Sequence, residues 1–146
     1  MNFVLFLSLF SMASAASFCP SRAVDAKEQV DIWGLFVKKF YFDKEVQTAF
    51  ADHIASDFIE HNPDALSGWN QTNIAGLAGL ISESNFTVMH DAFSNNTGYM
   101  HIRQDTSGAQ PLAIADIFRF NGSCIVEHWD IQQARPVDPI NPLAMW

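Results

Sequence analysis

The period of the hydrophobic positions changes near the middle of the chain. Before Phe86 apolar residues recur at helical spacing, and from Phe86 onward they alternate with polar residues as in strands. The first pattern predicts, in order, a helix over Asp25–Phe42, a helix over Lys44–Ile54 capped by Asp43, a short strand over Phe58–His61, and a helix capped by Thr72 that reaches Ile81. The second pattern predicts four strands, over Phe86–Phe93, Tyr99–Asp105, Leu112–Phe120 and Cys124–Gln132. Three helices followed by an antiparallel meander indicate an α+β fold, whose curved sheet would enclose a pocket at its open end.

Residues 1–16 have the pattern of a signal peptide. Phe3 to Phe10 is an almost unbroken apolar run, and Ala13-Ser14-Ala15 provides the small residues that signal peptidase requires. No Lys or Arg precedes the run, which departs from the usual pattern. The alternative, a membrane anchor, needs about 20 apolar residues, and this run is shorter. We therefore predict one secreted domain over residues 17–146, which ends in an extended Pro-containing tail over residues 135–146.

Two further features agree with an oxidising, secretory compartment. Four Asn-x-Ser/Thr sequons indicate a glycoprotein, with acceptors at Asn70, Asn85, Asn95 and Asn121. The remaining cysteines, Cys19 and Cys124, are expected to form one disulfide that ties the N-terminus to the last hairpin. The alternative is two separate buried thiols. A zinc site needs more ligands than two distant cysteines supply, so no metal is expected.

Charge and aromatic content restrict the partners. The formal net charge is −8, which opposes binding to nucleic acid or to anionic lipid. After signal cleavage no contact with a membrane is expected. Of the thirteen Phe, ten follow residue 16, and with four Trp they provide an ample core and could line a pocket for a small hydrophobic molecule.

A hairpin in the last third of the chain holds the candidate chemistry. Asn121-Gly122 is a strong turn signal between two strands that contain two carboxylates, a histidine and a tryptophan. A two-residue Asn-Gly turn would place Glu127 opposite Asp116, with Trp129 on the same face and His128 outside. A three-residue turn with a bulge would instead place His128 opposite Asp116. The turn residues and the apolar set around Trp129 favour the first register.

Asp116 is the first catalytic candidate. Side chains two apart on a strand share a face, so Phe118 and other apolar residues surround the carboxyl group. Desolvation would raise the pKa of that group and suit it to proton transfer near neutral pH. The alternative is a structural ion pair with a neighbouring arginine such as Arg103.

Three motifs together resemble the SnoaL-like, polyketide-cyclase-type branch of the NTF2-like superfamily, in the subgroup labelled as predicted aldol-condensation enzymes. They are Ile59-Glu60-His61-Asn62-Pro63, Asp116 to Arg119 and Ile125 to Asp130. The run Asp116 to Gly122 is also similar to one in ketosteroid isomerases. The resemblance implies a cone of helices over a curved sheet, commonly dimeric, so a homodimer is expected. The chain departs from most relatives in its signal peptide, its sequons, its disulfide and Ser123, where they carry Lys.

The remaining candidates are histidines and aromatic residues. His61 precedes Pro63 and could act as a base at the cavity mouth or only cap its loop through backbone contacts. His128 and His101 are further substrate-binding candidates, as are Phe118, Glu127 and Trp129. Each of the two histidines could instead lie only on the sheet surface. Trp33 suits the core, but the resemblance implies that the first helix also lines the cavity.

These observations lead to one main hypothesis and two alternatives. The sequence has no Gly-rich phosphate loop, no His-Glu-x-x-His and no Gly-x-Ser-x-Gly, which disfavours nucleotide, metalloprotease and serine-hydrolase chemistry. The main hypothesis is a secreted enzyme that needs no cofactor and catalyses proton transfer on a hydrophobic carbonyl compound. Cyclisation, isomerisation or dehydration would follow. The alternatives are a carrier of a small apolar ligand and a protein-interaction module.

Overall fold

The computed structural model describes residues 17–143 and 145–146, so the predicted signal peptide lies outside the described residues. The elements are, in order, α1 (Ala26–Val37), the π-helical turn η1 (Lys38–Phe42), α2 (Val46–His53), β1 (Ile54–Glu60), α3 (Gln71–Glu83), β2 (Ser84–Ser94), β3 (Thr97–Thr106), β4 (Leu112–Asn121) and β5 (Cys124–Ala134). Helices come first and a meander follows, which confirms the predicted α+β class.

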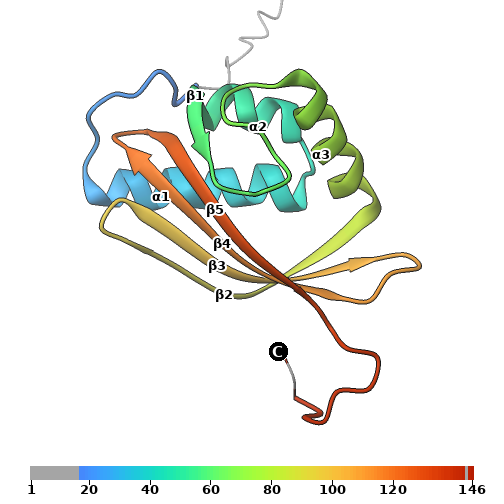
Figure 1. The fold of residues 1–146 in the computed structure, drawn as a ribbon. Coiled ribbons are helices and arrows are strands. Elements are labelled where there is room, and N and C mark those ends of the chain that lie inside the picture. Colours follow the sequence, from blue (N-terminus) through green and yellow to red (C-terminus); the bar gives the residue numbers. More distant parts are fainter. Residues whose placement is uncertain (1–16, 144) are drawn as a thin grey trace, which may run out of the picture.

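A curved, five-stranded sheet forms one layer, and the three helices cover its concave face (Figure 1). The strand order is β1-β5-β4-β3-β2. β2 to β5 pair antiparallel, as expected, but β1 pairs parallel with β5. A parallel pair needs a long crossover connection, and α3 with β2 to β4 provides it. β1 is also longer than the predicted strand, because it begins directly after α2.

Two helix starts differ from the prediction. Asn70 rather than Thr72 caps α3, and its side-chain oxygen accepts from the backbone N–H groups of Thr72 and Asn73 at 3.0 and 3.1 Å. Asp43 does not cap α2, because η1 extends the first helix and Asp43 terminates it, with its N–H donating to the Lys38 carbonyl. The chain then turns at Lys44, where φ is +60°, before α2 begins.

The core lies between the helices and the concave face of the sheet. Trp33 of α1 is 2% exposed and packs against Phe36 and Phe118. It also lies directly on Gly98 of β3, where a Cβ atom would come within 2.7 Å of the indole ring. Trp33 is therefore a core residue that requires glycine opposite it, and it does not line the pocket described below.

The N-terminal segment is fixed to the β4–β5 hairpin. Cys19 and Cys124 form the predicted disulfide, with their Cα atoms 5.2 Å apart. Closing a loop of 105 residues contributes up to about 4–5 kcal/mol in the chain-entropy model. Ser123 is fully buried, and its Oγ donates to the Phe18 carbonyl at 2.5 Å. A lysine would not fit this buried position.

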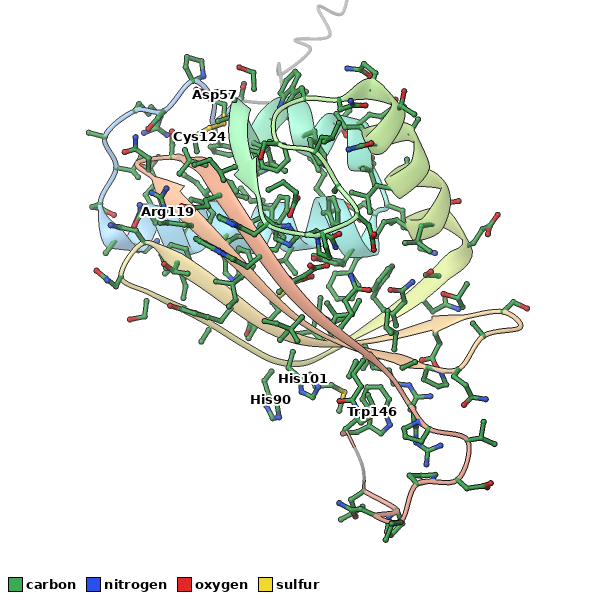
Figure 2. All side chains as sticks on the ribbon, in the orientation of Figure 1. Asp57, His90, His101, Arg119, Cys124 and Trp146 are labelled. Atoms are coloured by element: carbon green, nitrogen blue, oxygen red, sulfur yellow. A yellow bond between two sulfur atoms is a disulfide. The ribbon has the colours of Figure 1, made fainter. Side chains whose placement is uncertain are left out.

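The tail after Arg135 returns to the convex face of the sheet. Trp146 lies beside His101, and the Arg103 guanidinium lies 4.8 Å from its ring centroid (Figure 2). His90 stacks on the other side of His101, at 5.8 Å between ring centroids. The tail therefore contacts the outer face rather than the pocket. Within the described part of the chain no helix has the length and apolar character needed to cross a membrane.

Candidate functional site

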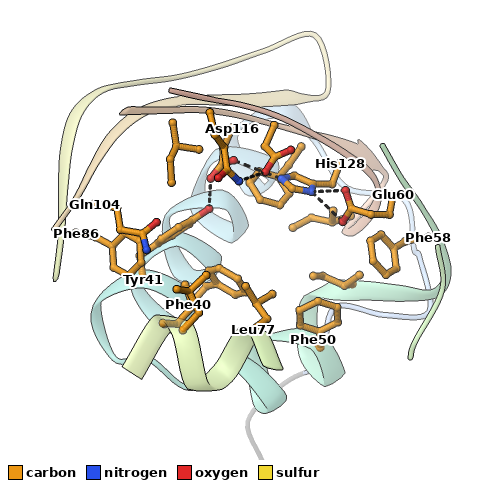
Figure 3. Close-up of a pocket in the computed structure, with 18 residues that line it drawn as sticks. Phe40, Tyr41, Phe50, Phe58, Glu60, Leu77, Phe86, Gln104, Asp116 and His128 are labelled. Atoms are coloured by element: carbon orange, nitrogen blue, oxygen red, sulfur yellow. Dashed lines mark hydrogen bonds and ion pairs between the residues drawn. The ribbon is translucent and has the colours of Figure 1, made fainter. Parts of the chain in front are cut away.

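A pocket of about 100 Å³ lies between the helices and the concave face of the sheet (Figure 3). Most of its wall is apolar, from Phe40, Phe50, Phe58, Leu77, Ile81, Phe86, Ile114, Phe118 and Ile125. The polar groups come mainly from the sheet side, and they are Tyr41, Glu60, Gln104, Asp116, His128, Asp130 and Gln132. A wider groove of about 400 Å³, bordered by the loop after β1 and by α3, shares Glu60, His128 and Asp130 with this pocket. The arrangement fits a small apolar ligand with a polar end.

The register of the last hairpin decides which residues enter this pocket. Asn121 pairs with Cys124, so the turn is Gly122-Ser123, and a bulge follows between the pairs at Arg119 and Phe120. Asp116 lies opposite Asp130, and Phe118 lies opposite His128. The register that we favoured from the sequence is therefore wrong, and His128 rather than Glu127 faces the pocket. The bulge absorbs one residue, which keeps Ile125 buried while it moves the following side chains to the other face.

Four polar side chains form a chain along the pocket wall. The Tyr41 hydroxyl donates to Asp116 Oδ2 at 2.5 Å, and Asp116 Oδ1 lies 3.5 Å from His128 Nε2. On the other side of the imidazole, Nδ1 lies 2.9 and 3.0 Å from the two carboxylate oxygens of Glu60. Asp116 is only 5% exposed. The side chains come from η1, β4, β5 and β1, so the whole fold is needed to bring them together.

This arrangement keeps a positive charge inside an apolar pocket. Burial lowers the pKa of His128, but the Asp116 and Glu60 carboxylates outweigh it and raise that pKa to about 10. The imidazole is therefore protonated at neutral pH, with N–H groups on both nitrogens. Burial, followed by the Asp116 charge, raises the pKa of the Tyr41 hydroxyl well above its ordinary value. Tyr41 is thus a neutral donor to Asp116.

His128 Nε2 is buried and has no hydrogen-bond partner within the described residues. Its separation of 3.5 Å from Asp116 Oδ1 is an ion pair rather than a hydrogen bond. A charged N–H that lies in a pocket without an acceptor is available to a ligand oxygen. Asp116 and His128 therefore present an acceptor and a donor side by side at the polar wall of the pocket.

The other predicted chemistry lies on the convex face of the sheet. Glu127 accepts from Arg119 Nε at 2.5 Å and lies 2.8 Å from His61 Nε2. Hydrogen bonds from His61 and then Arg119 lower the pKa of the Glu127 carboxyl. The His61 ring stacks on Trp129, with ring centroids 4.7 Å apart. The structure therefore brings His61, Glu127 and Trp129 together, but on the opposite face of β5 from Asp116, and none of them lines the pocket.

His101 and Arg103 are also on the outer face. His101 packs between His90 and Trp146 (Figure 2). Arg103 forms a two-point ion pair with Asp105 at 2.7 and 2.8 Å. Arg103 therefore does not neutralise Asp116, and the alternative of a structural ion pair between these two residues is wrong. Phe118 and His128 are the two predicted ligand-binding residues that line the pocket with Asp116.

Three ionisable pocket residues, Tyr41, Glu60 and Asp130, were not predicted from the sequence. Glu60 lies two residues after Phe58 on β1, and Asp130 lies two residues after His128 on β5. Residues two apart on a strand share a face, so both could be predicted once Phe58 and His128 were known to point inward. Tyr41 lies four residues after Val37, which belongs to the apolar stripe of α1. Its place in a π-helical turn leaves no signal in the sequence.

The four sequon asparagines differ in environment. Asn70 is half-buried, caps α3 and borders the groove at the pocket mouth. Asn85, Asn95 and Asn121 are exposed. Within residues 17–143 and 145–146 no three His, Cys, Asp or Glu side chains are placed to hold a metal ion.

The fold and the pocket together define an NTF2-like cone, and solved structures agree. AclR from Streptomyces galilaeus, a candidate hydroxylase, aligns with a TM-score of 0.57 and 16% identity over 77% of this chain and 83% of its own. A candidate polyketide cyclase from Acidithiobacillus ferrooxidans aligns with a TM-score of 0.55 and 12% identity, over 75% of this chain and 90% of its own. An NTF2-like protein from Cytophaga hutchinsonii aligns with a TM-score of 0.59 and 9% identity, over 78% of this chain and 94% of its own.

No family model matches the sequence, and no curated protein is similar to it. At these identities the likeness shows the fold alone. The chain has the NTF2-like cone found in SnoaL-like polyketide cyclases, which confirms the predicted resemblance at the level of fold. The narrower subgroup of aldol-condensation enzymes stays a prediction.

Proposed function

We propose that the protein is a secreted enzyme that transfers a proton on a hydrophobic carbonyl compound with its own side chains. The observation that carries the proposal is the pairing of a buried carboxylate with a charged imidazole, only 16% exposed, at the polar wall of an apolar pocket. Candidate polyketide cyclases among the structural neighbours support a substrate of this class. Cyclisation, isomerisation or dehydration would each begin with the same step.

In that step Asp116 removes a proton from the carbon next to the carbonyl group. The C–H electron pair moves into the enolate, whose oxygen accepts a hydrogen bond or the proton from His128 Nε2. Tyr41 holds the Asp116 carboxylate in place, and Glu60 keeps His128 charged and oriented. The apolar wall excludes water, so the charge that develops on the oxygen meets a preorganised donor in a medium of low dielectric.

Secretion, glycosylation and a homodimer belong to the proposal as well. The Cys19–Cys124 disulfide supports an oxidising compartment. The exposed positions of Asn85, Asn95 and Asn121 leave those sequons accessible to glycans. The exposed apolar residues Tyr99 and Ile131 on the convex face support contact with a second copy.

A non-catalytic carrier is the second candidate. The observation that favours it is that the Tyr41–Asp116 and Glu60–His128 contacts already satisfy much of the polar wall. In a carrier the same donor would hold a ligand oxygen and no proton would leave carbon.

Exchange of carbon-bound hydrogen for deuterium separates the two candidates without knowledge of the product. The purified protein is incubated in D₂O buffer with 2-tetralone and related hydrophobic ketones, and deuterium next to the carbonyl is followed by mass spectrometry. We expect the wild type to accelerate exchange and Asp116→Asn to lose at least about 100-fold of that acceleration.

Asp91→Asn is the matched control, because Asp91 is exposed on β2 and the substitution is the same. It should exchange at the wild-type rate. Equal acceleration by wild type and Asp116→Asn would contradict the assignment of Asp116. Ketone binding without any exchange in the wild type would favour the carrier.

A further inference from the structure

The pocket has an excess of negative charge. Its lining contains the carboxylates of Glu60, Asp116 and Asp130, and no Lys or Arg is among the lining residues. The only cationic group is His128, which lies between Glu60 and Asp116 and already compensates one of those two charges. A carboxylate or phosphate ligand would meet this field unfavourably, whereas a cation would be attracted.

Asp130 has no counter-ion among the described residues. Its Oδ2 accepts from the neutral side-chain amides of Asn62, at 2.7 Å, and Gln132. No Lys, Arg or His nitrogen of the described residues lies within 4.0 Å of this carboxylate. Asp130 is half-buried and borders both the inner pocket and the groove outside it. A carboxylate in this position, next to apolar walls and without a cation, is a ready partner for a positively charged ligand group.

The rest of the pocket suits the apolar body of such a ligand. Aromatic rings from Phe40, Phe50, Phe58 and Phe86 form much of the wall, and aromatic faces also attract cations. The Nε2 atom of His128, which has no hydrogen-bond partner among the described residues, offers a donor to a ligand oxygen. Asp130 and His128 lie on the same face of β5, two residues apart, so one ligand can reach both.

From these contacts we infer that the site takes apolar carbonyl compounds that carry a protonated amine, with Asp130 as the acceptor for the ammonium group. The inference rests on the proposed function for the identity of the reacting group, but the amine preference is a property of the pocket alone. It therefore gives the proposed enzyme a substrate class that the fold does not specify.

Three probes with one bicyclic skeleton test the preference. They are 2-aminotetralin, which is cationic at pH 7, the neutral 2-tetralol, and the anionic 1,2,3,4-tetrahydro-2-naphthoate. Dissociation constants are measured by isothermal titration calorimetry with the full mature protein. We expect the amine to bind at least about tenfold more tightly than the alcohol, and the carboxylate to bind most weakly.

Asp130→Asn keeps the shape and one acceptor oxygen but removes the charge. It should weaken amine binding by about tenfold and change alcohol binding by less than about threefold. Asp91→Asn, on β2, should leave all three constants unchanged. Circular dichroism confirms that each variant is folded.

Each contrary result would overturn the inference. The first is that the alcohol or the carboxylate binds as tightly as the amine. The second is that the preference for the amine remains in Asp130→Asn, and the third is that no probe binds to the folded protein. Failure here is distinct from failure of the proposed function. Deuterium exchange with neutral ketones can occur without an amine preference, and amine binding can occur without exchange.

Discussion

Two histidines with little exposed surface, His53 and His128, lie in environments that shift the pKa of the imidazole in opposite directions. His53, at the end of α2, is 1% exposed and packs between Phe18 and Phe36, with ring centroids 4.7 and 5.7 Å away. Neither of its nitrogens has a hydrogen-bond partner within the described residues. His128, in the pocket, lies between two carboxylates.

The pKa values diverge accordingly. Burial, followed by the nearby Lys39 charge, lowers the pKa of His53 to about 4, and Asp52 offsets this only in part. Desolvation also lowers the pKa of His128, yet Asp116 and Glu60 outweigh it and raise that pKa to about 10. Burial that no carboxylate outweighs therefore removes the charge of a histidine, whereas desolvation beside two carboxylates leaves the charge in place. The first environment suits a structural core and the second suits acid/base chemistry.

The largest expected effect is on stability at high pH, and His128→Gln tests it. The folded pKa of His128 lies above the unfolded value of 6.5, so its contribution to stability is complete below about pH 6.5 and is lost as pH rises through about 10. For the wild type we expect the free energy of unfolding to fall by as much as about 4 kcal/mol more than for the variant over this range. Urea unfolding at pH 6, 8 and 10 measures the difference.

The wild type has to be compared with the variant at each pH, because lysines and tyrosines also titrate at high pH and affect both proteins. At neutral pH His128→Gln should be less stable than the wild type, since Asp116 and Glu60 then face each other without a cation. If wild type and variant lost stability in parallel between pH 6 and 10, His128 would not carry a raised pKa.

A smaller effect of opposite direction is expected at low pH from His53→Phe. The folded pKa of His53 lies below 6.5, so the unfolded state takes up the proton first and stability falls as pH drops from about 6.5 through 4. This loss amounts to about 3 kcal/mol when complete. The phenylalanine variant should lack it, and thermal unfolding between pH 4 and 7 measures the change. An acid loss of the same size in both proteins would contradict an unprotonated His53.

The smallest effect sharpens the comparison by moving His128 towards His53. Glu60→Gln removes one of the two carboxylates, so the pKa of His128 should fall by about 1–2 units and stay above that of His53. Ring-proton NMR titration reads this directly. Glu127→Gln is the matched control, because it removes a carboxylate from the other face of β5, the strand that contains His128. In this variant the pKa of His128 should not change. An unaltered His128 pKa in Glu60→Gln would assign the whole rise to Asp116.

The comparison also shows which parts of the molecule the sequence could predict. Helices, strands and the disulfide followed from local patterns, because the apolar period and the cysteine count act independently of distant contacts. Asp116 followed as well, since it alternates with apolar residues on β4. The partners of Asp116 did not follow, because a single bulge in β5 exchanges the two faces of the strand.

Contacts of Ser123 explain why the Asn121-Gly122 turn signal predicted the wrong register for the hairpin. An Asn-Gly pair normally forms the two central residues of a hairpin turn, but here the turn is shifted by one residue. The Ser123 N–H donates to the Arg22 carbonyl at 3.0 Å, and a Cβ atom on Gly122 would lie 2.1 Å from that carbonyl oxygen. The N-terminal segment therefore selects the register, and a contact between residues about a hundred positions apart leaves no local pattern.

The π-helical turn η1 has a consequence for how this site could change over generations. Its backbone bond from Asp43 to the Lys38 carbonyl spans five residues instead of four, so the turn holds one residue more than an α-helix needs. Tyr41 reaches Asp116 from within that turn. Loss of one codon there would restore a regular helix, rotate the phenol away and leave the rest of the cone intact. If the proposed function holds, a single small deletion in the coding sequence is thus a short route from a catalytic cone to a purely binding one.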